Sequence, residues 1–374
     1  ISRCARRRAR EAQQEEGADI GLRVFVGQRT AIVSASDLSS RTISEMAERA
    51  VAMAREAPEN PYAGLADAGQ VATDWDAAAL ELFDPAPAPA PEALQQDAAE
   101  AEAAARAVDG ITQIDAASAG YNAYDIHMAG SNGFSGGYRR SSHGLSCVAI
   151  AGSGTQMERD YDGDSRVFQS DLRAPSEIGR TAAERTLLRR DPRKPPTGTY
   201  PVLFDERIAA SLIRHLLGAV NGSAITRGAS FLRGSMDQQV LPEGLSLIED
   251  PHRPRLGSSR PFDAEFLPTA KRTIIENGYL RSWTLDLGTA RQLGLASTAN
   301  AGRGVSSGPS PSSAGIALTQ GAQSRDDLIR DLGTGLLVTS MIGSTINPNT
   351  GDYSRGAAGL WVENGEITYA VNEC

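Results

Sequence analysis

Hydrophobic and polar positions near the start of the chain predict a β-hairpin followed by a helix. Residues 22–26 and 30–34 are short β-type runs, and the three residues between them, Gly27-Gln28-Arg29, predict a three-residue loop. Apolar side chains then recur three or four positions apart from Ile43 to Ala54, which is the spacing of one helix face. Because Pro58 follows this run, the predicted helix ends before it.

The rest of the amino-terminal half predicts two more helices around a sheet. Residues 84–91 alternate proline and alanine, which predicts an extended surface connection. Residues 92–108 are mostly Ala, Glu and Gln, which favour a helix. From 111 to 172, short β-type runs are separated by Gly and Ser, so we expect an antiparallel sheet. Pro175 then suits the first turn of a third helix, which should end near Leu188.

A proline-rich segment divides this pattern in two. Residues 191–196 contain three prolines, and few regular elements can cross such a stretch. The chain has 374 residues, whereas single hydrophobic cores usually stop growing at roughly 250–300 residues. We therefore expect one domain over residues 1–191 and a second over residues 197–374.

The second half has the pattern of a mostly antiparallel domain. It begins with an apolar strand over residues 200–204 and a helix over 206–217. Asn277-Gly278 and Asn364-Gly365 each lie between β-type runs, and Asn-Gly is the strongest short signal for a type I′ hairpin turn. The sequence thus predicts an α+β fold, with an amino-terminal α/β domain and a mostly antiparallel β carboxy-terminal domain.

Composition and charge narrow the class of protein. Hydrophobic residues make up 40% of the chain and charged residues 22%, which is typical of a globular protein. The net charge of -9 opposes binding to nucleic acid, because phosphates attract Lys and Arg. No run approaches the roughly 20 apolar residues that cross a bilayer, and no apolar signal segment opens the chain. The three cysteines suggest no disulfide framework, so we expect a cytoplasmic protein that binds neither nucleic acid nor membrane.

One basic run stands apart from this composition. Five arginines lie between Arg3 and Arg10, and such a run is typical of a targeting or nucleic-acid-binding arm. The alternative is a frayed or artificial chain end. We favour the frayed end, because the run stops at Glu11 and an ordinary soluble pattern follows.

Few residues offer catalytic chemistry by their spacing. None of the four histidines has a second His or Cys at metal-ligand spacing: they are His127, His143, His215 and His252. Ser135, in Gly133-Phe134-Ser135-Gly136-Gly137, matches the Gly-x-Ser-x-Gly pattern of serine hydrolases. That pattern needs a strand before the serine and a helix after it. The glycine-rich surroundings favour a hairpin or loop instead.

Two further patterns have ordinary interpretations. Asp160, Asp162 and Asp164 resemble the start of a calcium loop, but the later bidentate Glu is missing, so we expect a solvated turn. The loops over residues 302–308 and 351–356 are rich in Gly and could bind an anion or a backbone. Neither has the spacing of a phosphate-binding loop before a helix, so we expect flexible connections.

Five segments in combination are characteristic of one family. They are Gly21 to Gly27, Ala57 to Leu65, Asn132 to Gly136, Asp286 to Gly294 and Asn347 to Gly356. The chain resembles the PmbA (TldE) members of the TldD/PmbA metallopeptidase family, from about Glu11 to Glu373. The resemblance implies the two-domain TldD/PmbA fold and a cytoplasmic heterodimer with a TldD-like catalytic subunit. It also implies that the pair degrades or trims peptides with the help of zinc.

The resemblance also implies where the catalytic members hold zinc, namely on a His-Glu-x-x-x-His helix together with a distant Cys. In this chain the three motif positions fall on Ile213, Arg214 and Gly218. Ile and Gly offer no side-chain lone pair to zinc, and Arg214 adds a repelling charge. His215 lies one residue from the Glu position, which turns it about 100° around the helix. We therefore expect no metal, cofactor or catalytic residue in this chain, and zinc in the partner subunit.

The chain departs from the family pattern at two residues and at its ends. Phe266 stands where the family usually has Gly, and Gly288 stands where a bulkier residue is usual. We also expect the family's opening segment and its last stretch, beyond Glu373, to lie outside this chain, as in a fragment or a truncated gene.

Three functional hypotheses follow. The first is a non-metal-binding subunit of a TldD/TldE-type heterodimeric metallopeptidase, which helps to enclose peptide or unfolded protein substrates during cytoplasmic proteolysis and peptide maturation. The alternatives are a stand-alone serine-type hydrolase that uses Ser135, and a peptide-binding scaffold without peptidase activity. For the first, we predict partner contact through the carboxy-terminal domain, with Trp283 and Trp361 as candidate interface residues. The alternative for both tryptophans is a place in the core.

Overall fold

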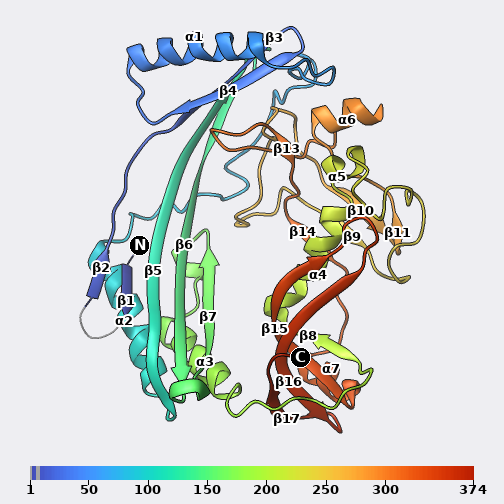
Figure 1. The fold of residues 1–374 in the computed structure, drawn as a ribbon. Helices are drawn as coiled ribbons and strands as arrows, with labels where there is room; N and C mark the ends of the chain where they lie inside the picture. The colour runs from blue at the N-terminus through green and yellow to red at the C-terminus, as the bar shows by residue number, and fades with distance from the viewer. Residues whose placement is uncertain (1, 6–8) are drawn as a thin grey trace.

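The computed structural model describes residues 2–5 and 9–374, and it has the α+β fold that the sequence predicts (Figure 1). A five-stranded antiparallel sheet with the order β2-β1-β5-β6-β7 organises the amino-terminal half. Its strands are β1 (Ser2–Ala5), β2 (Ala9–Ala12), β5 (Ile111–Ala129), β6 (Ser135–Ala151) and β7 (Glu158–Arg166). Short 3-10 turns, Gly154–Gln156 and Gln169–Asp171, flank β7. The predicted sheet over residues 111–172 is confirmed.

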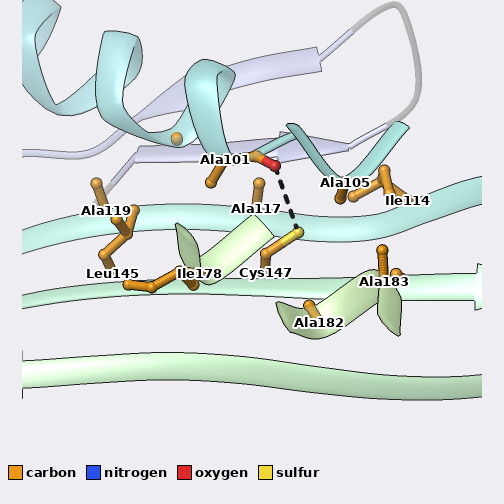
Figure 2. Packing of buried hydrophobic residues seen from close by; sticks show 12 residues of the cluster. Ala101, Ala105, Ile114, Ala117, Ala119, Leu145, Cys147, Ile178, Ala182 and Ala183 are labelled. Carbon is orange, nitrogen blue, oxygen red and sulfur yellow. Dashed lines mark hydrogen bonds between the residues drawn. The ribbon is translucent and has the colours of Figure 1, made fainter. Parts of the chain in front are cut away.

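Helices α2 (Pro91–Arg106) and α3 (Pro175–Leu187) pack on one face of this sheet, close to their predicted bounds. The core between them consists mainly of small aliphatic side chains, as Figure 2 shows. Alanine allows the two helices to approach closely, and a Cβ at Gly179 would overlap the carbonyl oxygen of Ala101. Cys147 lies in the same layer, with its Sγ 4.0 Å from that carbonyl oxygen. The alanine-rich sequence therefore specifies a thin, tightly packed layer.

The first predicted hairpin is present as β3 (Ile20–Val26) and β4 (Arg29–Ala35), followed by α1 (Ser40–Glu56) with Ser39 as its N-cap. Val26 pairs with Arg29, so the loop has two residues, and the predicted three-residue loop is wrong. Gly27 has φ +60°, which suits the first central position of a type II′ turn. Such two-residue turns match the twist of the strands, which is why this register is favoured.

The carboxy-terminal half contains three small sheets, ordered β11-β10-β9-β14, β17-β16-β15-β8 and β12-β13. β8 runs parallel to β15, and the other pairs are antiparallel. The strands are β8 (Val202–Phe204), β9 (Leu247–Glu249), β10 (Arg272–Glu276), β11 (Tyr279–Leu280), β12 (Ala301–Gly302), β13 (Ser310–Pro311), β14 (Ile316–Leu318), β15 (Gly335–Ile346), β16 (Tyr353–Glu363) and β17 (Glu366–Val371). The helices are α4 (Glu206–Ala219), α5 (Gly222–Thr226), α6 (Leu287–Leu293) and α7 (Arg325–Leu332).

Both predicted Asn-Gly turns are confirmed. Asn277 and Gly278 have φ values of 47° and 87°, and they join β10 to β11. Asn364 and Gly365 have φ values of 53° and 79°, and they join β16 to β17. Two successive positive φ values are the mark of a type I′ turn, which Asn and Gly tolerate better than other residues.

The amino-terminal basic run contributes strands to the first sheet. β1 pairs with β5 from Ser2 opposite Ala119 to Cys4 opposite Ala117, and β2 pairs with β1. The prediction of a frayed end is therefore wrong for residues 2–5 and 9–12, while residues 6–8 of the run lie outside the described residues. None of the helices in the described part of the chain combines the length and the apolar composition needed to span a bilayer.

The predicted solvated turn at Asp160 to Asp164 is also wrong, because these residues lie on β7. Asp160 and Asp162 are only 7% and 4% exposed. Arg207 of α4 donates to Asp160 over 2.8 Å, and Arg185 of α3 donates to Asp162 over 2.6 Å. The alternating aspartates therefore point to one side of a strand, where arginines neutralise them, and they tie β7 to the carboxy-terminal half.

Candidate functional site

Helix α4 is the element on which the family resemblance places the zinc motif. Ile213 is partly buried against the core formed by residues such as Leu280 and Trp283. Arg214 is exposed, and the space around Gly218 is open. The three positions thus supply an alkyl group, a cation and no side chain at all, and this donor set does not fit zinc.

The histidines are separated in space as well as in sequence. The His215 ring contacts Tyr353, with centroids 5.5 Å apart, and His252 Nε2 lies 3.0 Å from Thr269 Oγ1. His143 is buried, with Nε2 3.3 Å from the Asp84 carboxylate. Across residues 2–5 and 9–374, no group of three or more His, Cys, Asp or Glu side chains is arranged to hold a metal ion.

Ser135 begins β6, immediately after the turn that joins it to β5, so the predicted hairpin is confirmed. Its Oγ lies 3.3 Å from His127 Nε2 on the neighbouring strand. His127 has no second His or Cys at metal-ligand spacing in the sequence, but the register of the hairpin brings its ring to Ser135. No carboxylate in the described part of the chain forms a hydrogen bond or ion pair with the His127 ring. The surroundings also lack the strand-turn-helix that a nucleophile elbow requires.

A polar pocket of about 250 Å³ lies where three of the family-like segments meet. β3 contributes Arg23, the 57–65 segment contributes Tyr62 and Gly64, and the start of α6 contributes Asp286 and other residues. The guanidinium of Arg291 on α6 holds the second segment in place. It donates to the carbonyl oxygens of Tyr62 and Gly64 over 3.2 Å each and to that of Leu65 over 2.7 Å.

Glu265 and Asp286 are buried acids of this pocket, and the pKa of Glu265 is raised. Glu265 Oε2 accepts a 2.7 Å hydrogen bond from the backbone N–H of Leu287, and its Oε1 lies 3.7 Å from Arg23. Burial raises the pKa of Glu265 to about 7; the negative charges of Asp286 and Asp263 add to the rise, and the Leu287 N–H and Arg23 oppose it. A carboxyl group in this state can hold or release a proton near neutral pH.

The structure explains both departures from the family pattern. Phe266 has φ +74°, a conformation that favours glycine, so the usual Gly at this position is a backbone requirement. The Phe266 ring offsets this strain by stacking on Phe134, with centroids 4.6 Å apart. Gly288 lines the polar pocket, and the nearest atom to a Cβ placed there is Asp286 Oδ1 at 3.8 Å. The glycine therefore leaves room in the pocket that a bulkier residue would reduce.

Trp283 and Trp361, the two candidate interface residues, are 6% and 2% exposed. Trp283 belongs to the core beside α4, and Trp361 packs between Tyr200 and Tyr369. Their rings make their contacts inside the chain, so they do not offer the surface that the interface hypothesis needs. Partner contact through the carboxy-terminal half stays a prediction.

Sequence reasoning missed the pairing of Arg23 with Glu265, because the two residues lie in different halves of the chain. The family-like segments were the one signal that could have found it. Of the five segments, three line one pocket. Another, around Asn132, donates from Asn132 Nδ2 to the carbonyl oxygen of Ala66 over 3.0 Å. Segments that resemble the family but lie in different helices, strands and loops are therefore candidates for one common site.

Comparison with known proteins identifies the family. The chain matches the domains of the PmbA/TldA metallopeptidases: domain 1 over residues 3–54, the central domain over 84–190 and the C-terminal domain over 197–374. It is 39% identical over 356 residues to metalloprotease PmbA of Escherichia coli O157:H7, covering 95% of this chain and 76% of that protein.

Two solved structures share the fold. A protein of Bacteroides thetaiotaomicron, described as a candidate modulator of DNA gyrase, has a TM-score of 0.90 at 25% identity, covering 99% of this chain and 82% of that one. TldE of Thermococcus kodakarensis has a TM-score of 0.85 at 20% identity, covering 99% and 84%. The chain therefore belongs to the PmbA/TldE family of TldD/TldE-type peptidase-like proteins.

Proposed function

We propose that this chain is the non-metal-binding subunit of a cytoplasmic TldD/TldE-type heterodimeric metallopeptidase. The proposal rests on helix α4. The family resemblance places the zinc motif on this helix, but the three motif positions are occupied by Ile213, Arg214 and Gly218. Ile213 packs against the core, Arg214 is an exposed cation and Gly218 has no side chain, so none of the three offers a ligand to zinc. The zinc and the reacting groups then belong to a TldD-like partner, and this chain helps to enclose the peptide substrate.

The proposal is tested by reconstitution. The chain is purified without chelator and analysed for zinc, and peptide cleavage is measured for the chain, for the TldD-like partner and for the mixture. We expect substoichiometric zinc in the chain alone and full activity only in the mixture. About one zinc per chain, lost on mutation of any of the four histidines, would overturn the proposal, and so would equal activity of the partner without this chain.

The contact between Ser135 and His127 supports a second candidate, a stand-alone serine-type hydrolase. This candidate requires cleavage by the chain alone, lost in Ser135→Ala. Ser131→Ala is the matched control, because Ser131 lies exposed in the same turn. Peptide binding without cleavage, with or without the partner, would instead support the scaffold.

A further inference from the structure

A second and larger pocket lies beside the start of β3. Its volume is about 490 Å³, within the range of roughly 300–1,000 Å³ that is usual for ligand sites. The walls come from the start of β3, from β5 and β6 near the turn that joins them, and from the loop after β12. Elements from both halves of the chain therefore enclose it.

The loop after β12 is the segment for which the sequence predicted a flexible connection; residues 303–307 are exposed, but the backbone of the loop contacts β3. A Cβ at Gly21 would overlap the carbonyl oxygen of Val305, so β3 rests directly on the loop. A Cβ at Gly302 would lie 2.8 Å from Ser312 Cβ, which is closer than side chains approach. These two glycines allow the backbone on either side of Arg303 to be held in place.

Three guanidinium groups line this pocket without forming an ion pair with a carboxylate of the described part of the chain. Arg140 donates to the carbonyl oxygens of Gly257 and Ser259, the latter over 2.7 Å. Arg260 donates to the carbonyl oxygens of Ala301 and Ser312 over 3.1 and 2.6 Å. Arg303 has no side-chain hydrogen bond or ion pair within the described residues; burial lowers its pKa, and the negative charge of Glu265 opposes that shift. Backbone carbonyls orient the first two groups, and neither of these groups forms an ion pair with a described residue.

The acidic residues of the pocket do not cancel this charge. Asp263 is fully buried, and its carboxylate accepts hydrogen bonds from the backbone N–H groups of Glu265, Leu267 and Ala301 at 2.9 to 3.0 Å. Burial lowers the pKa of Arg260, with Asp263 and Glu249 opposing the shift. Asp19 is exposed. An incoming anion would therefore meet a net positive, partly desolvated site.

The other residues that line the pocket favour a peptide ligand that contains the anionic group. Ile126, Met128 and Val305 give apolar contacts beside the arginines. β3 pairs with β4 alone in the described sheet, so its other backbone edge is unpaired, and Ile20 and Gly21 at its start line the pocket. Extended peptides commonly bind along such edges, with pockets for alternate side chains. The chain's net charge of -9 opposes a polyanion such as nucleic acid.

We propose that this pocket binds a carboxylate group of an extended peptide and that Arg303 is its direct partner. The inference rests on the proposed function for the identity of the ligand as a peptide. The carboxylate comes either from the peptide's carboxy-terminus or from a Glu or Asp side chain. Arg303 suits the role because it lies at the open surface, whereas Arg140 and Arg260 are occupied with the walls.

Direct binding to the full chain, without the partner subunit, tests the site. The probes are short fluorescein-labelled peptides: one with a free carboxy-terminus and no acidic residue, one amidated with an internal Glu, and one amidated without acidic residues. We expect the native chain to bind at least one of the first two roughly tenfold more tightly than the third. Preference for the first alone assigns the terminal carboxylate, and preference for the second alone assigns the side chain.

Variants then link this preference to the pocket. Arg303→Glu is expected to abolish the preference, and Arg303→Lys to retain part of it, because charge persists without the bidentate fork. Arg180→Glu on α3 is the matched control, since it makes the same charge change at an exposed site. Equal binding of all three peptides, no binding, or an unchanged preference in Arg303→Glu would overturn the inference. Failure of the proposed function would appear separately, as cleavage by the partner that does not depend on this chain.

Discussion

Glu265 and Phe266 are neighbours that the fold holds in unfavourable states for different reasons. Phe266 adopts a left-handed backbone conformation, which costs free energy that the stacked aromatic ring recovers. Glu265 places a carboxyl group among other acids, where ionisation is opposed by burial and by the charges of Asp286 and Asp263. Residues in such states are commonly found at functional sites, because elsewhere selection removes them.

The pKa of Glu265 gives a pH-dependent prediction. It is raised from 4.5 to about 7, so the folded chain binds this proton more tightly than the unfolded chain does. The corresponding stability is fully present below pH 4.5 and is lost as the pH rises through about 7. At about 1.4 kcal/mol per pKa unit, the loss is on the order of 3 kcal/mol.

Glu265→Gln should remove this loss, because the amide cannot ionise. The measurement is the free energy of unfolding in urea at pH 5 and pH 8 for the native chain and the variant. We expect a steeper decline with pH in the native chain than in Glu265→Gln. Glu366→Gln, at an exposed site, is the control and should follow the native chain. Parallel declines in all three proteins would contradict the assignment.

At the scale of elements, local patterns predicted most of the fold. Apolar periodicity and the following Pro58 predicted α1, and the Asn-Gly pairs predicted both type I′ turns. The failures had two causes. The two-residue loop at Gly27 follows from the twist of the paired strands, which the β-type runs alone do not specify. The burial of Asp160 follows from Arg207 on α4, and that contact cannot be seen in a short window of sequence.

Helix α4 allows a prediction about the zinc motif. We expect the triple variant Ile213→His, Arg214→Glu, Gly218→His to lack zinc-dependent peptidase activity on its own. A distant Cys ligand is implied by the family resemblance, but Cys147 is buried under α2 and burial raises its pKa to about 12. Cys374 lies outside α4, and its Sγ donates to the carbonyl oxygen of Ala357 on β16. A working site also needs groups that orient each imidazole, and these are not supplied by three substitutions.

The measurements are zinc content and cleavage of a peptide by the triple variant without a partner. Ile213→Ala is the control for folding, since removal of a partly buried Ile costs on the order of 2 kcal/mol by itself. Robust cleavage that disappears with chelator would show that the three substitutions alone create a zinc site with peptidase activity, and the prediction would be wrong.

At the scale of the whole molecule, residues on either side of the proline-rich segment at 191–196 contact one another extensively. Phe134 at the upper end of the β5–β6 hairpin stacks on Phe266, and Arg207 pairs with Asp160. The candidate site could be predicted from sequence only as a set of family-like segments, because its geometry arises where these contacts bring the segments together. The two predicted domains stay a prediction, and the two halves are expected to be mechanically coupled.

Substitution of Arg291, which joins α6 to the segment 60–66, tests this coupling. Arg291→Ala removes the hydrogen bonds to the carbonyl oxygens of Tyr62, Gly64 and Leu65, and a bond to a charged group contributes about 1.5–3 kcal/mol. We expect a loss of stability of that order and faster proteolysis within residues 60–66, mapped by mass spectrometry. Arg291→Lys should rescue little, because an ammonium group lacks the fork that reaches three carbonyls. The control is Arg180→Ala, which changes an exposed arginine on α3; this variant should be cleaved by the protease at the native rate. If Arg291→Ala also stayed as resistant as the native chain, the 60–66 segment would be held by its apolar contacts alone, and the coupling through α6 would be refuted.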